Sequence, residues 1–186
     1  MKIKQKQKHN IILYVILSIL GIFTVYQYFY ADTVIFLICA VSVVFMYWFS
    51  NKDILTRTIP AIPVYAAMGV IFLLRFCYMC ENTVERVPVF IVKSIIVFLV
   101  LHILSKVLCG KIGNGDFDIA YIIYLCVGIT GLFYAFAAAC VLVLIRSLPI
   151  IMKKHKNLKS CSIPFIPYMY AGYLMVLLFA KELIFI

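Results

Sequence analysis

The sequence predicts an all-α membrane protein with about seven transmembrane helices and a cytoplasmic N-terminus. Two observations indicate this class: 66% of the 186 residues are hydrophobic, and only 13% are charged. Ordinary soluble domains have about a quarter of their residues charged, and a soluble chain of this length needs far more polar surface to cover its core. We therefore exclude the soluble globular, disordered and collagen-like classes, and we expect one membrane domain over residues 1–186.

Seven apolar runs correspond to the expected helices. The first run follows the basic segment 1–10, and its length and aromatic end favour a retained helix over a cleaved signal peptide. The fifth run is short, so we expect the stretch before it, 110–116, to enter the protein. The predicted spans are 11–30, 33–50, 61–78, 88–108, 117–130, 132–152 and 164–186.

The positions of Lys and Arg predict the orientation, because basic residues gather in cytoplasmic loops. The opposite face has Arg86 in its longest loop, and Arg75 and Lys93 near helix ends, where long side chains can extend to the interface. The net charge of +10 therefore indicates orientation rather than nucleic-acid binding. With the N-terminus inside, most basic residues fall in four cytoplasmic segments: 1–10, 51–60, 106–116 and 152–162.

Two acidic residues, Asp53 and Asp116, fall on the predicted cytoplasmic face although they are far apart in the sequence. We expect Asp53 near the C-terminus of the second helix and Asp116 at the N-terminus of the fifth. Two carboxyl groups in one partly desolvated pocket cannot both ionise cheaply, so one holds a proton while the other draws a proton from water. Such a pair hydrolyses an amide without a covalent intermediate. Gly113 and Gly115 would leave room for an extended peptide beside Asp116.

Each carboxylate also has a purely structural interpretation. Asp116 can cap a helix after a glycine hinge, and Asp53 can pair with Arg57 one turn later. Asp118 is two residues from Asp116 and therefore need not share its face of the helix. An intramembrane histidine such as His102 can line a site or simply hydrogen-bond between helices.

Three segments resemble motifs of the type IV prepilin peptidase family. The stretch from Asp53 to Pro60 has the form D-x-x-x-R-x-I-P and is similar to the family's first aspartate motif. The sequence GNGDF at 113–117 is similar to the G-x-G-D motif. The sequence PFIP, from Pro164 to Pro167, resembles the P-F-x-P segment that opens the family's last helix. The three occur in the family's order.

The resemblance covers residues 33–186 and leaves 1–32 as an additional N-terminal helix. It implies a membrane-embedded aspartic endopeptidase whose catalytic pair is Asp53 and Asp116. Its substrates would be prepilins or pilin-like membrane proteins, which lose short basic leaders at the cytoplasmic face of the cell membrane. We expect no cofactor, no metal and no nucleic-acid partner. The remaining residues that we assign to the substrate-binding loops are Gly113, Gly115, Pro60, Pro164 and Pro167.

The chain departs from the family pattern at Ala61, where members often have Asn or Asp, and at Asp118, where they commonly have Lys. It also lacks the cytoplasmic insertion with paired C-x-x-C motifs, so it resembles the short forms. The presenilin and signal-peptide-peptidase group also uses G-x-G-D, but it has Tyr before the first aspartate, where this chain has Lys52. A non-catalytic scaffold or a small-solute carrier is the alternative from another class. Carriers place their polar groups near the bilayer midplane, whereas these aspartates lie at one edge.

Overall fold

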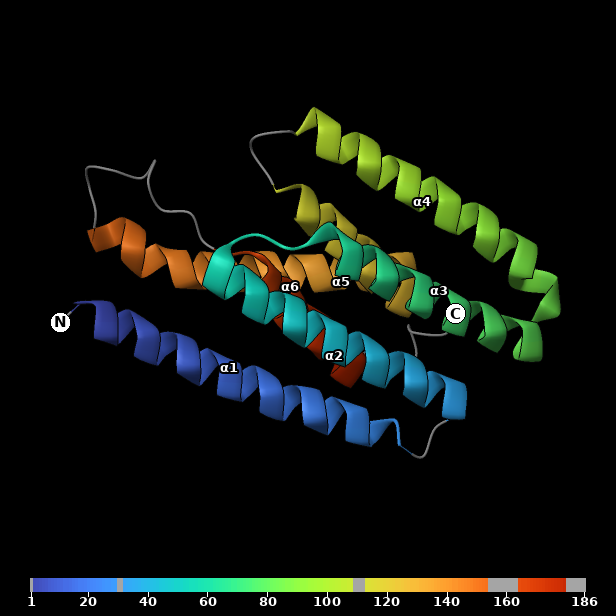
Figure 1. The fold of residues 1–186 in the computed structure, drawn as a ribbon, viewed down its shortest axis with the longest axis horizontal. Coiled ribbons are helices and arrows are strands. Elements are labelled where there is room, and N and C mark those ends of the chain that lie inside the picture. Colours follow the sequence, from blue (N-terminus) through green and yellow to red (C-terminus); the bar gives the residue numbers. More distant parts are fainter. Residues whose placement is uncertain (1, 30–31, 109–112, 154–163, 180–186) are drawn as a thin grey trace.

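The computed structural model describes residues 2–29, 32–108, 113–153 and 164–179 (Figure 1). Within these ranges the chain is entirely helical and contains no strand, which confirms the predicted all-α class for the part described. Of the stretch 110–116, which we predicted to enter the protein, residues 110–112 lie outside the described residues, and of the basic segment 152–162 only 152 and 153 lie within them. The elements are α1 (Lys2–Gln27), α2 (Thr33–Thr56), α3 (Ala61–Asn82), η1 (Val84–Arg86), α4 (Val87–Val107), α5 (Asn114–Lys153) and α6 (Ile166–Phe179).

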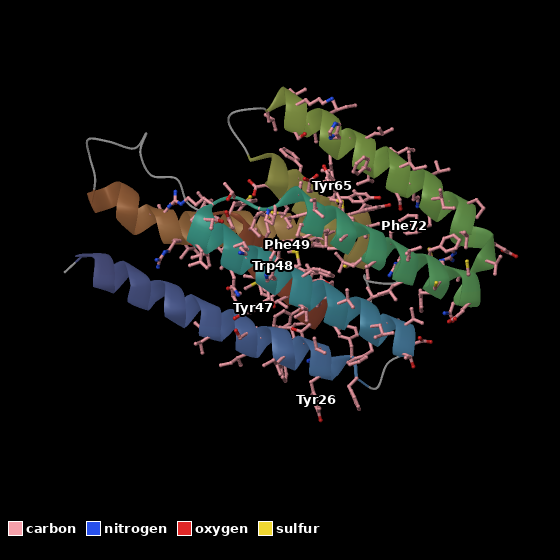
Figure 2. All side chains as sticks on the ribbon, in the orientation of Figure 1. Tyr26, Tyr47, Trp48, Phe49, Tyr65 and Phe72 are labelled. Carbon is pink, nitrogen blue, oxygen red and sulfur yellow. The ribbon has the colours of Figure 1, made fainter. Side chains whose placement is uncertain are left out.

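Several of these helices have the length and composition of membrane spans. Large apolar side chains point outward along them; Ile62 on α3, for example, is 83% exposed, and Tyr26 on α1 points away from the bundle (Figure 2). Apolar exposure on this scale suits lipid and not water, so the chain has the features of a membrane protein. In the described part, four segments are long and apolar enough to cross a membrane: Thr33–Thr56, Ala61–Asn82, Val84–Val107 and Gly115–Leu148.

Helix α5 joins the predicted fifth and sixth helices. Its one residue with non-helical dihedral angles is Gly128, with φ 72° and ψ −176°, a conformation essentially restricted to glycine. Figure 1 shows the chain running out along the first arm of α5 (yellow) and returning along the second (orange). The boundary that we predicted at Gly131 is therefore wrong. Gly131 stays helical, and a Cβ added there would lie 2.6 Å from Cβ of Val127, so this glycine allows the close approach that the break creates.

The centre of the bundle is the contact between α5 and α6. A Cβ added at Gly172 of α6 would collide with the carbonyl oxygen of Ala135 and lie 3.2 Å from the backbone nitrogen of Ala139. Both alanines are fully buried on the second arm of α5. Small residues allow transmembrane helices to approach this closely, and the contact fixes the position of α6 within the fold.

Helix α1 packs on α2 and α6, at the side of the bundle away from α4 (Figure 1). The hydroxyl of Tyr28 donates a hydrogen bond of 2.8 Å to the carbonyl oxygen of Leu177. The buried hydroxyls of Ser42 on α2 and Tyr173 on α6 are 2.6 Å apart. A buried polar group costs little when it is hydrogen-bonded, so these pairs connect the helices without leaving polar atoms unsatisfied.

Candidate functional site

Asp53 is buried at one end of the bundle, with 8% of its surface exposed. It lies in the last turn of α2, because that helix continues to Thr56 and not only to residue 50 as the apolar run predicted. Its carboxylate oxygen Oδ2 accepts a hydrogen bond of 3.2 Å from the backbone nitrogen of Ile166. Ile166 begins α6, where the first backbone N–H groups have no partner within the helix. The start of α6 therefore holds the Asp53 carboxyl group.

Asp116 lies in the first turn of α5, half-buried. Its backbone N–H donates a hydrogen bond of 3.0 Å to the carbonyl oxygen of Gly113, which forms the turn that leads into the helix. Because α5 begins at Asn114, Asp116 lies inside the helix and does not occupy the N-cap position. The negative charge of Asp53 acts on the Asp116 carboxyl group. The structure therefore places the two carboxyl groups near enough for their charges to interact.

The connection between α2 and α3 also lies beside Gly115, in the segment that contains Gly113 and Asp116. A Cβ added at Gly115 would lie 3.6 Å from Cδ1 of Ile59, and one added at Gly113 would lie 3.5 Å from Oδ2 of Asp116. These are ordinary van der Waals distances, so the fold itself tolerates alanine at both positions. A side chain at Gly113 would occupy the space directly beside the Asp116 carboxyl group.

The three prolines that we assigned to the site lie at helix starts. Pro60 is the exposed residue immediately before α3. Pro164 is half-buried just before α6, and Pro167 is buried in the first turn of α6. Proline suits a first turn because its missing N–H would have had no helical partner there. Pro60 shapes the segment that carries Ile59, and Pro164 and Pro167 shape the segment that carries Ile166.

A cavity of about 440 Å³ extends from Asp116 between α4 and both arms of α5. Phe165, in the segment just before α6, closes one side of the cavity and packs edge-on against Phe136, with ring centroids 5.7 Å apart. The other lining side chains are apolar or small, among them Leu101, Phe117, Ala120 and Phe133. The site therefore combines a carboxyl pair with an apolar groove. Sequence reasoning missed Phe165 and Ile59, although both lie inside the motifs that it used.

The third acidic residue of this region, Asp118, has a different electrostatic partner from Asp116. Asp118 interacts electrostatically with His102 of α4, and His102 stacks on Phe98 with ring centroids 6.1 Å apart. Asp116 lines the cavity, whereas Asp118 does not. Arg57 is exposed at the end of α2, and its charge acts on Asp53.

Comparison of the chain with protein-family models, with curated proteins and with solved structures found no match. Among the residues that the structure describes, no cluster of three or more His, Cys, Asp or Glu side chains could hold a metal ion.

Proposed function

We propose that this chain is an intramembrane aspartic endopeptidase, similar to the short prepilin peptidases, with Asp53 and Asp116 as its catalytic pair. The observation that carries the proposal is the electrostatic interaction between the two carboxyl groups, which come from the end of α2 and the start of α5. The hydrogen bond from Ile166 to Asp53 adds the start of α6 to the same place. Each of the three segments that resemble family motifs thus has a residue that interacts with another of the three.

The carboxyl pair can hydrolyse a peptide bond by general acid–base catalysis. The ionised carboxylate takes a proton from water, and the resulting hydroxide attacks the scissile carbonyl carbon while the protonated carboxyl group donates its proton to the carbonyl oxygen. On collapse of the tetrahedral intermediate the C–N bond breaks, the leaving nitrogen takes a proton from one carboxyl group, and a hydroxyl of the intermediate gives its proton to the other carboxylate, so that the pair again holds one proton. The backbone N–H of Ile166 keeps one oxygen of Asp53 in place through this cycle.

The cavity beside Asp116 suits a substrate that is itself a membrane helix. Its apolar lining can accept an apolar segment, and Asp116 lies at its edge. A prepilin or pilin-like protein has this form, with a short basic leader followed by a hydrophobic helix. In the proposed arrangement the chain crosses the cell membrane about seven times, with its N-terminus and both aspartates at the cytoplasmic face.

The proposed orientation predicts a pattern of cysteine labelling. Single cysteines are introduced into a variant that lacks the native ones, and intact cells are treated with a membrane-impermeant thiol reagent. Positions 81–86 should label from outside, whereas 1–9 and 153–159 should label only after the membrane is opened, because Lys and Arg concentrate in those two segments. Labelling of 153–159 from outside would place the aspartate end of the bundle on the wrong face.

The residue before the cut should control the cleavage rate. Hydrolysis requires an extended scissile segment, so the substrate helix must unwind where it leaves the lipid, and a glycine before the cut eases this unwinding. The family's preference for glycine there agrees. In a scan of that position in a cleaved precursor, Gly→Ala should slow processing and Gly→Val should stop it. Equal rates for glycine and valine would contradict this interpretation of the groove.

A further inference from the structure

We propose that the opposite end of the bundle contains a second site, which binds the phosphate of an anionic lipid headgroup. Arg75 of α3, Arg86 of η1 and Lys93 of α4 line one cavity of about 340 Å³. The sequence places these three cations separately, each near its own helix end, but the packing of α3 against α4 brings them to one cavity. Neither Asp53 nor Asp116 lines this cavity, so the inference does not depend on the proposed protease activity.

The charges around the cavity favour an anion. Arg75 is buried, at 8% exposure, with its guanidinium 5.9 Å from the centre of the Tyr78 ring. None of the described residues that line the cavity is acidic, and Glu81 and Glu85 are exposed outside it. Three positive charges around one space repel each other, and the repulsion falls when an anion lies between them. The guanidinium group of arginine can donate two parallel hydrogen bonds to the oxygens of one phosphate, and the ammonium group of lysine adds a compact positive charge.

The backbone contributes in the same direction. Gly128, where α5 breaks, also lines the cavity. The second arm of α5 begins at that break, and the start of a helix carries a partial positive charge. The three side-chain cations and this helix start therefore act on the same space.

The rest of the lining indicates a lipid and not a free inorganic anion. Val89, Phe90 and Leu125 supply apolar surface beside the three cations. Arg86 lies in the connection between α3 and α4, and Lys93 is in the second turn of α4, so the cavity is near the helix ends, where lipid headgroups lie. A basic pocket between transmembrane helices suits an anionic headgroup for the same electrostatic reason as the pockets that bind such headgroups on the cytoplasmic side of membranes. A headgroup with its glycerol and upper acyl chain suits a cavity whose lining has both basic and apolar side chains.

Binding of phosphatidylglycerol, compared with phosphatidylcholine, to the purified full chain tests the proposal. The readout is the lipid-bound fraction in native mass spectrometry. Arg86→Gln and Lys93→Gln should each weaken phosphatidylglycerol binding by about fivefold, the factor expected for one basic residue beside an anionic lipid. Both residues are exposed, so folding should survive. Lys106→Gln is the matched control, because Lys106 is exposed at the other end of α4, and it should bind as the wild type does.

Three outcomes would overturn the proposal. The first is equal binding of the two lipids by the wild-type chain, and the second is a loss in Lys106→Gln as large as that in Lys93→Gln. The third is displacement of phosphatidylglycerol by an equal concentration of inorganic phosphate, which would identify the ligand as a soluble anion.

Discussion

Replacement of either Asp53 or Asp116 with Asn is expected to reduce the cleavage of a pilin-like precursor by at least about a hundredfold, the scale of general acid–base catalysis. Asn keeps the size of the side chain but can neither hold nor take the proton that the cycle requires. The two groups act as one unit, so the double variant should be no slower than the worse single variant. The rate is measured from the appearance of the shortened product by gel or mass spectrometry.

Asp118→Asn is the matched control for this experiment. It removes a carboxylate from the same turn of α5, but that carboxylate interacts with His102 and does not line the cavity. This variant should keep most of the activity, and all of the variants should remain in the membrane at wild-type levels. An Asp53→Asn variant with near-normal turnover would remove Asp53 from the catalytic pair, and equal losses in all three positions would indicate a general effect of negative charge.

The second large effect is expected at Gly172. A Cβ there collides with the backbone carbonyl of Ala135, and a backbone atom cannot move aside as a flexible side chain can. Gly172→Ala should therefore push α6 away from α5 and destabilise the protein by about 1–3 kcal/mol, the range for overpacked cores. Since α6 begins with the N–H that holds Asp53, cleavage should fall as well. Thermal unfolding of the purified protein in detergent measures the change in stability.

Gly69→Ala provides the comparison, because Gly69 is also helical but, apart from its chain neighbours and the nearby backbone of its own helix, no atom lies within 4 Å of its added Cβ. Alanine favours a helix over glycine by about 1 kcal/mol, so Gly69→Ala should leave the melting temperature unchanged or raise it. If the Gly172→Ala variant has the same melting temperature as the Gly69→Ala variant, then α5 and α6 do not pack as closely as the structure has them.

Hydropathy was enough to predict the helical class and the approximate position of each helix, but not where helices end. The apolar run of α2 stops near Ser50, whereas the helix continues through a polar turn to Thr56. Hydropathy indicates which residues contact lipid. The backbone hydrogen bonds of a helix do not require that contact, so a helix can continue beyond its apolar run. Similarly, Gly128 and Gly131 look alike in the sequence, and only the three-dimensional path of α5 shows which of them has a positive φ.

The candidate site was predictable to the extent that topology and side-chain chemistry define it. Orientation rules placed Asp53 and Asp116 at one end of the bundle, and the structure has their carboxyl groups interacting. The third contact of the site is the backbone N–H of Ile166, which every residue except proline carries, so no residue type could have signalled it. The cavity that Phe165 closes depends on how α4, α5 and the start of α6 pack, which no local pattern encodes.

The most direct test of the proposed catalytic pair is the mass of a pilin-like precursor after incubation with the purified chain in membranes or detergent. The precursor should have a short basic leader, a glycine before the cut and a hydrophobic helix after it. We expect a single product that has lost the leader mass, with its new N-terminus at the cytoplasmic edge of that helix, and a rate of product formation at least about a hundredfold lower for the Asp53→Asn/Asp116→Asn chain. Product formation by that double variant at the wild-type rate, or a cut at the other end of the precursor's hydrophobic helix, would contradict the assignment of Asp53 and Asp116.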